Sequence, residues 1–276
     1  MNLVIQGPSL SAEQALEVAR LAGSTRAPKI AEHAWRIHGA APAEAIPAFC
    51  ERNQIDYAWM PDGRRFADLK LLAMDMDSTL ITIECIDELG DLAGKKPEIA
   101  AITARAMRGE IDFAESLRKR VSLLQDLPLA ALERVYDERL RLTSGAEALL
   151  SACKKYGVRV LLVSGGFTFF TERLKARLGL DYTISNTLET RDGRLTGKVL
   201  GDIVGAEAKA TKFVSVLKSL DAPREQSVAI GDGANDLKML AEAGLSVAFR
   251  AKPVVAAQAH CQVRWSGLDA IPNLFE

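Results

Sequence analysis

The sequence predicts an α/β fold: a doubly wound, mostly parallel, Rossmann-like sheet as the core, with an inserted four-helix cap and a small N-terminal α+β domain. Three observations support this prediction. Apolar runs of strand length alternate with amphipathic helical segments from residue 143 onward. One further apolar run, LLAMD at 71–75, is separated from that alternation by a long, purely helical stretch. The segment 1–66 mixes strand and helix patterns of its own.

The composition describes an ordinary globular protein with a small-molecule partner. Of the 276 residues, 48% are hydrophobic and 26% are charged, which allows a sizeable core. Lys and Arg number 35 against 36 Asp and Glu, so no bulk charge attracts nucleic acid or a membrane surface. The N-terminus lacks the pattern of a signal peptide, and no run is long enough to span a bilayer, so we expect a cytoplasmic location. The oligomeric state is not fixed, and a homodimer stays open.

The cysteines and histidines do not form a metal-binding pattern. The four cysteines are scattered without CxxC spacing, which favours reduced thiols in the core over disulfides or zinc ligands. His33 and His38 stand near the N-terminus, and His260 stands alone near the other end. We interpret all three histidines as structural or surface residues.

The first domain, 1–66, carries no chemical motif. Its strand-like segments are LVIQ and DYAWM, with a third candidate in APKIAEHAWRIH, and its helical segments are SAEQALEVARLAG and PAEAIPAFCERN. The cap, 83–142, contains four amphipathic segments separated by Gly or Pro: IDELGDLAG, PEIAAITARAMRG, DFAESLRKRVSLLQDL and PLAALERVYDERL. Because the cap interrupts the core, which comprises 67–82 and 143–276, we expect it to act as a lid over the strand ends.

The second part of the core alternates regularly. A helix closed by Gly157 precedes the strand VRVLLV, and a helix closed by Gly179 follows it. The strand YTIS, a hairpin around Arg191-Asp192-Gly193 and the helix KATKFVSVLKSL come next. The strand SVAIGD, the helix NDLKMLAEAG and the strand LSVAF complete the pattern. This order is typical of a parallel sheet covered by helices on both faces.

Two carboxylates follow the first core strand directly. In a parallel sheet, ligands bind beyond the carboxyl ends of the strands, which is where Asp75 and Asp77 stand in DMDST. The alternative is that one of them caps the turn after the strand while the other is solvated.

Other strand ends carry matching chemistry. SGG at 164–166 follows VRVLLV, Lys209 begins a helix, and GDGAND at 231–236 follows SVAI. Independent turn caps would not converge in this way. Aspartates supply the hard oxygen ligands that Mg²⁺ prefers, while a serine hydroxyl, glycine amides and a lysine can bind phosphate oxygens. The set predicts a magnesium-dependent phosphoryl-transfer site.

DMDSTL, SGGF, the lysine at a helix start and GDGANDL resemble, in this order, the four motifs of the haloacid dehalogenase-like hydrolase superfamily. ECIDEL, AMRGEIDFAESLRKRVSLL, SGGFTFF and GDGANDLKML further resemble its phosphoserine phosphatase family. The resemblance runs from about residue 69 to residue 260. It implies hydrolysis of O-phospho-L-serine, the last step of serine biosynthesis. Some relatives carry ACT-like modules at the N-terminus, but 1–66 shows no clear signature of one.

The resemblance also implies the catalytic roles. Asp75 would attack phosphorus and form an aspartyl-phosphate, and Asp77 would act as general acid and then general base. The Asp75 side chain, the Asp77 backbone carbonyl and Asp232 would bind Mg²⁺. Asp236 would support them from the outer shell or hold Lys209; its alternative is an acid favoured by a helix dipole.

Ligands for the substrate are implied in the same way. Ser164, the Gly165 amide and Lys209 would bind the phosphate. Asn235 matches a position near the phosphate and the leaving group; alternatively it caps the helix that follows.

The cap residues would select the substrate. Glu84 matches the acid that recognises the ammonium group, and Arg120 matches the arginine that binds the carboxylate. Met107 and Phe113 match apolar residues that close over the substrate. Taken singly, Arg120 would instead be a solvated helix charge, and Met107 and Phe113 would be bundle core. Thr79 and Lys252 also match the pattern; no role is assigned to them.

Two other functions stay open. Related enzymes act on phosphothreonine or transfer phosphate to homoserine, which keeps the chemistry and changes the substrate. A receiver or binding module would instead store phosphate on an aspartate as a signal. Asp77 argues against storage, because a residue that activates water shortens the lifetime of a phosphoaspartate.

Overall fold

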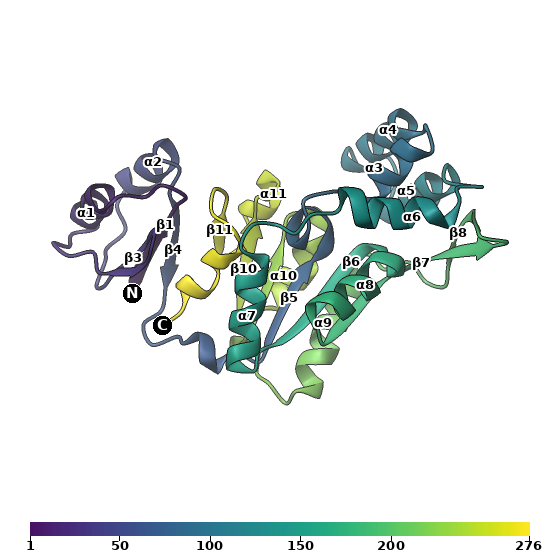
Figure 1. Cartoon of the computed structure of the whole chain (residues 1–276). Coiled ribbons are helices and arrows are strands. Elements are labelled where there is room, and N and C mark those ends of the chain that lie inside the picture. Colours follow the sequence, from purple (N-terminus) through teal and green to yellow (C-terminus); the bar gives the residue numbers. More distant parts are fainter.

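The computed structural model describes all residues from 1 to 276 and contains two sheets. A four-stranded sheet has the order β2-β3-β1-β4, and a seven-stranded sheet has the order β11-β10-β9-β5-β6-β7-β8. Figure 1 shows the small sheet with its helices on one side of the large sheet, and helices α3 to α6 above its far end. The α/β class with a parallel core and a small N-terminal unit is therefore confirmed.

The N-terminal unit has both helices and every strand that the sequence predicts. Its elements are β1 Asn2–Gln6, α1 Ala12–Leu21, β2 Lys29–Ala31, β3 Ala34–Ile37, α2 Ala45–Arg52 and β4 Asp56–Met60. Strand β1 pairs antiparallel with β3 and β4. The third candidate strand is in fact two short strands, because the chain turns between Ala31 and Ala34 and β2 pairs back on β3.

This unit is fixed to the rest of the molecule on both sides of its sheet. Leu3 and Ile5 pack with α1 and α2, whereas Val4 belongs to the main core cluster together with Phe275. The buried Arg36 guanidinium donates to the backbone carbonyls of Asn273 and Phe275. The two chain ends consequently lie near one another, as Figure 1 shows.

Strand β5 lies at the centre of the large sheet. The strands are β5 Leu71–Asp75, β6 Arg159–Phe167, β7 Tyr182–Arg191, β8 Arg194–Leu200, β9 Ser227–Gly231, β10 Leu245–Phe249 and β11 Cys261–Val263. Strand β5 pairs in parallel with β6 on one side and with β9 on the other. The strand order reverses there, which is the point where open α/β sheets bind ligands.

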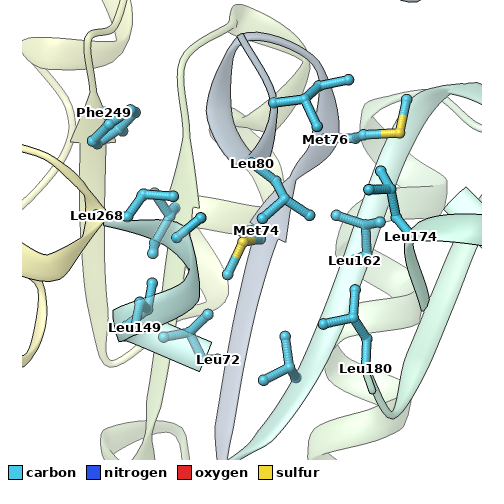
Figure 2. Close-up of a cluster of buried hydrophobic side chains, with 14 of the residues drawn as sticks. Leu72, Met74, Met76, Leu80, Leu149, Leu162, Leu174, Leu180, Phe249 and Leu268 are labelled. Atoms are coloured by element: carbon cyan, nitrogen blue, oxygen red, sulfur yellow. The ribbon is translucent and has the colours of Figure 1, made fainter. Parts of the chain in front are cut away.

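Both faces of β5 are covered, which explains its uninterrupted apolar pattern. Figure 2 shows Leu72 and Met74 among side chains that include Leu149 of α7 and Leu174 of α8. Residues on the opposite face of β5, such as Leu71, pack with helices α9 and α10. The helices are α7 Ala146–Tyr156, α8 Thr168–Leu178, α9 Ala206–Ser219, α10 Leu237–Glu242 and the short α11 Pro253–Ala256.

The cap consists of the four predicted helices. They are α3 Cys85–Leu92, α4 Lys96–Met107, α5 Phe113–Ser122 and α6 Leu129–Arg134, the last followed by a π-helical turn at Val135–Arg139. Two linkers join the cap to the core and pair with each other: Thr82 N–H donates to the Arg141 carbonyl and Thr143 N–H to the Leu80 carbonyl, both at 3.0 Å. The predicted cap boundaries fall within this paired segment.

Strands β7 and β8 form an arm of the large sheet that reaches the cap. The predicted hairpin is confirmed, with Asp192 and Gly193 both at positive φ in the turn that joins β7 to β8. The arm is longer than the YTIS pattern indicated, and β8 packs against α5. Sequence analysis also missed the edge strand β11, which has only three residues.

All four cysteines are free and buried, as the sequence analysis expected. None of the helices combines the length and the apolar character that crossing a bilayer requires.

Candidate active site

The first two candidate residues are presented by the end of β5. Asp75 is its last residue, and its Oδ1 accepts a hydrogen bond from the Met76 N–H at 2.7 Å. The chain then turns sharply, with Asp77 extended and Ser78 in the left-handed region at φ 57°. This turn brings both carboxylates to one side of the sheet edge, where they line the same cavity.

Asp77 connects three parts of the site. Its Oδ1 accepts from the Cys85 N–H at the start of α3, at 2.8 Å, and its Oδ2 accepts from the Ser164 hydroxyl at 3.3 Å. Burial, together with the nearby charge of Glu84, raises the pKa of Asp77 to about 7. A carboxyl group with this pKa can both donate and accept a proton near neutral pH.

Lys209 joins two of the aspartates. It is fully buried in the first turn of α9, and its Nζ donates to Asp75 Oδ2 at 2.7 Å and to Asp236 Oδ1 at 2.8 Å. Burial alone would lower the pKa of Lys209, but the two carboxylates raise it, so the ammonium stays charged. Burial and Asp236 raise the pKa of Asp75, while Lys209 acts in the opposite direction.

Three carboxylates gather around this lysine. Oxygens of Asp75, Asp232 and Asp236 lie within 4.8 Å of one another. Burial, with Asp236 next, raises the pKa of Asp232 to about 6. Thr79 holds Asp232 through a 3.4 Å hydrogen bond. Because one ammonium does not balance three carboxylates, the cluster has an excess of negative charge and only hard oxygen donors, which fits a divalent cation.

Asp236 also has the local role that the sequence left open. Its Oδ2 accepts from the Gly233 N–H at 3.1 Å while its Oδ1 binds the lysine. Asp236 therefore binds Lys209 and also lies directly before a helix, so these two interpretations hold together. The helix-cap alternative for Asn235 is wrong, because α10 begins at Leu237 and Asp236 occupies the position before it. Asn235 lines the cavity instead.

The turn after the straight part of β6 is packed closely against Asp77. The Gly166 N–H donates to Ser164 Oγ at 2.8 Å. A side chain at Gly166 would place its Cβ 2.8 Å from Asp77 Oδ2, and one at Gly165 would place its Cβ 2.9 Å from the Phe113 ring. Real Cβ atoms do not approach that closely, so the glycines let the cap and Asp77 approach this strand end.

Core and cap enclose a cavity of about 560 Å³. The predicted residues that line it are Asp75, Asp77, Glu84, Met107, Phe113, Arg120, Gly165, Asp232, Asn235 and Lys252. Ser164, Lys209, Asp236 and Thr79 stand directly behind this lining through the hydrogen bonds given above. The structure thus brings together every residue that the sequence analysis selected, and their catalytic roles stay predictions.

The cap side of the cavity is charged. Glu84 is held by Ser78, whose hydroxyl donates to Glu84 Oε1 at 2.8 Å. Arg120 Nε is buried and has no hydrogen-bond partner. Burial lowers the pKa of Arg120, whereas the charges of Asp87 and Glu84 raise it. A half-buried guanidinium that lines a cavity and has an Nε without a partner is suited to bind an anionic group of a ligand.

Met107 and Phe113 differ from each other in exposure. Met107 is 66% exposed at the cavity, so the bundle-core alternative is wrong for it. Phe113 is half-buried and its ring lies against Gly165.

The residues of this region that the sequence did not indicate include Ser78, which holds Glu84, and Asp87 and Ser116, which line the cavity. For Ser116 a signal was available, because it stands four residues before Arg120 and therefore on the same face of one helix. The role of Ser78 depends on its positive φ, which no sequence pattern predicted.

Comparison with known proteins agrees with this geometry. A family model described as haloacid dehalogenase-like hydrolase matches residues 72–241, more than half of the chain. The chain belongs to the haloacid dehalogenase-like hydrolases. A second model, described as a domain of unknown function, matches residues 3–46 of the same hydrolase.

Curated relatives of this hydrolase are named phosphoserine phosphatase. The protein from Polaromonas sp. is 54% identical over 76% of this chain and 91% of its own length. The protein from Vibrio cholerae is 47% identical over 79% of this chain and 66% of its own length.

Two solved structures resemble the hydrolase over almost its whole length, and a third resembles three quarters of it. A probable phosphoserine phosphatase from Vibrio cholerae has a TM-score of 0.87 at 38% identity and covers 99% of this chain and 86% of its own. A haloacid dehalogenase family hydrolase from Salmonella enterica has a TM-score of 0.89 at 31% identity, covering 100% and 98%. A substrate-bound phosphoserine phosphatase complex has a TM-score of 0.71 at 40% identity, covering 75% and 99%.

Proposed function

We propose that this hydrolase cleaves O-phospho-L-serine to L-serine and phosphate, the last step of serine biosynthesis. One observation carries the proposal: a single cavity joins the acidic strand ends of the core, with Lys209 directly behind Asp75, to Glu84 and Arg120 of the cap. Phosphoserine has a phosphate, an ammonium and a carboxylate, and the cavity offers a group of suitable charge for each. The names of the relatives support the same substrate. The cytoplasmic location stays a prediction, and the oligomeric state stays open.

The substrate is oriented by charge. Arg120 binds its carboxylate, for which a planar guanidinium is well shaped, and Glu84 binds its ammonium group. The Ser164 hydroxyl, the Gly165 N–H and Lys209 donate to the phosphate oxygens, and Asn235 lies beside them. Met107 and Phe113 line the cap side of the cavity, where they would cover the bound substrate and exclude water from the reacting groups.

The first chemical step breaks the bond between phosphorus and the serine oxygen. An Asp75 carboxylate oxygen attacks phosphorus and forms an aspartyl-phosphate. Asp77 donates its proton to the departing oxygen, which leaves as the hydroxyl of serine. The raised pKa of Asp77 supplies the proton at neutral pH.

The second step restores the enzyme. Asp77, now ionised, removes a proton from a water molecule that attacks phosphorus. The bond from phosphorus to the Asp75 oxygen breaks, which releases phosphate and the free carboxylate. Lys209 stays beside Asp75 through both steps and stabilises the charge that is transferred.

The residues for a metal cofactor are present. Asp75, Asp232 and the Asp77 backbone carbonyl would hold Mg²⁺, with Asp236 supporting from behind through Lys209. When bound, Mg²⁺ supplies positive charge that lets the anionic phosphate approach the anionic nucleophile.

A turnover comparison tests the proposal. Purified protein with Mg²⁺ should hydrolyse phosphoserine with a higher kcat/KM than phosphothreonine, and should transfer little phosphate to added homoserine. Chelation of the metal should stop turnover, and added Mg²⁺ should restore it. Faster hydrolysis of an unrelated phosphate ester, with phosphoserine left intact, would exclude the substrate that we propose.

A further inference from the structure

We propose that the Ser116 hydroxyl is a second ligand of the substrate carboxylate and acts beside Arg120. The inference rests on the proposed function and adds a specificity residue to its site. Ser116 belongs to α5, where it shares the cavity-lining face with Phe113, Leu117 and Arg120.

Ser116 has the properties of a binding group without its ligand. The residue is 1% exposed, and its Oγ is buried without any hydrogen-bond partner. Its backbone N–H, by contrast, is satisfied by the Asp112 carbonyl at 2.9 Å. A buried hydroxyl without a partner is unfavourable, so such groups in native proteins require an explanation. A ligand oxygen in the cavity provides one here.

Its neighbour has the same deficit. Arg120 stands one helical turn after Ser116, and its Nε is likewise buried without a partner. Two unsatisfied donors on adjacent turns of one helix face, both lining one cavity, fit an acceptor with two oxygens. A carboxylate has this form, and its lone pairs can accept from a guanidinium and a hydroxyl together.

The other groups of phosphoserine fit Ser116 less well. The phosphate is bound by donors of the core strand ends, around Ser164 and Lys209. The ammonium group would be repelled by Arg120 one turn away, and the cap offers the acids Glu84 and Asp87 for it. The carboxylate is the group that remains.

A serine elsewhere in the chain serves as a matched control. Ser266 Oγ is also buried without a partner, but Ser266 does not line the cavity. We would compare S116A and S266A with the wild-type protein, all loaded with Mg²⁺. The substrates are phosphoserine and O-phosphoethanolamine, which keeps the phosphate and the ammonium group and lacks the carboxylate.

S116A should raise KM for phosphoserine about tenfold, because it removes one hydrogen bond to a charged group. Its kcat/KM for O-phosphoethanolamine should equal that of the wild-type protein, and S266A should leave both substrates unaffected. The thermal midpoint of ligand-free S116A should be unchanged or higher, since the lost hydroxyl had no partner. A structural role for Ser116 would lower it.

The outcomes separate this inference from the proposed function. Wild-type protein that does not hydrolyse phosphoserine overturns both. Wild-type protein that hydrolyses phosphoserine, with S116A showing an unchanged KM or an equal loss on both substrates, overturns the role of Ser116 alone.

Discussion

Asp77 of the core accepts a hydrogen bond at 2.8 Å from the backbone N–H of Cys85, the first residue of the cap helix α3. The carboxyl group that would transfer the proton is therefore attached to the element that covers the substrate. Because Cys85 N–H is one of the free donors at the start of α3, Asp77 also satisfies that helix end. Proton transfer and cap position depend on the same side chain.

Replacing Asp77 with Asn should separate these two roles. Asn keeps an oxygen that can accept from Cys85 N–H, so the fold and the cap should be preserved. It cannot give up or take a proton, and kcat for phosphoserine should fall about 10²- to 10⁴-fold. p-Nitrophenyl phosphate, whose leaving group needs no proton, should lose less in single-turnover measurements. An equal loss for both substrates would contradict the acid role.

Asp75→Asn should abolish turnover and leave the fold intact. The amide is not nucleophilic, so no phosphoenzyme can form at this position. Lys209 keeps its bond to Asp236, which maintains the packing around it. Acid quenching after incubation with phosphoserine that is labelled in its phosphate group should trap the label on the wild-type chain and none on the variant. Labelling of D75N would move the nucleophile elsewhere.

Lys209→Met should destabilise the protein strongly. The change leaves buried carboxylates without their cation, which costs about 3–5 kcal/mol when a buried pair is broken. Lys238→Met is the matched control, because Lys238 is exposed and pairs only with the exposed Glu207, and it should change the free energy of unfolding by less than about 1 kcal/mol. Denaturant unfolding in the absence of metal measures both.

Arg120→Lys should weaken selection of the substrate rather than the chemistry. A lysine retains the charge but not the planar fork, so KM for phosphoserine should rise about tenfold or more, with little change for p-nitrophenyl phosphate. Arg118→Lys, an exposed position on the same helix, should have no effect. If both substrates lose equally, Arg120 acts in folding of the cap.

The acidic cluster predicts an unusual dependence of stability on pH. Burial raises the pKa of Asp77 to about 7 and that of Asp232 to about 6. A carboxyl group with a raised folded-state pKa stabilises at low pH, and this contribution is lost as the pH rises through that pKa. Between about pH 4 and about pH 7, the metal-free wild-type protein should therefore lose thermal stability as the pH rises. D232N should lose less, and the difference between the two proteins should develop between about pH 4 and about pH 6.

Mg²⁺ should reverse this trend. The ion binds carboxylates in their ionised form, so its stabilising effect should grow as the pH rises through about 6. Thermal unfolding at several pH values, with and without Mg²⁺, measures both effects. A metal effect in D232N as large as in the wild-type protein would exclude Asp232 as a ligand.

Sequence patterns were sufficient for most elements of the core and the cap. Gly157 and Gly179 occupy left-handed positions after α7 and α8, so the helix ends could be read directly. The edge strand β11 could not be predicted from the sequence, because a strand of three residues shows no detectable hydrophobic period.

The sequence was sufficient to predict which residues form the candidate site, but not the hydrogen bonds between them. Parallel strand ends converge, so Asp75 and Asp232 had to lie near each other. That Asp77 would bind the start of α3 depends on the left-handed turn at Ser78, a conformation that no sequence pattern predicted. The unpaired state of Ser116 and Arg120 becomes visible only when all neighbouring atoms are in place.

The contacts of Arg36 determine when the N-terminal sheet can complete its packing during synthesis. A ribosome delivers the N-terminal sheet first, whereas the carbonyls of Asn273 and Phe275 that accept from the Arg36 guanidinium follow 237 and 239 residues later. Until then, Val4 and its neighbours on that face lack Phe275, with which they share a core. Residues 273–276 thus complete this part of the fold, and a nascent chain without them would expose an apolar face and a cation without these acceptors.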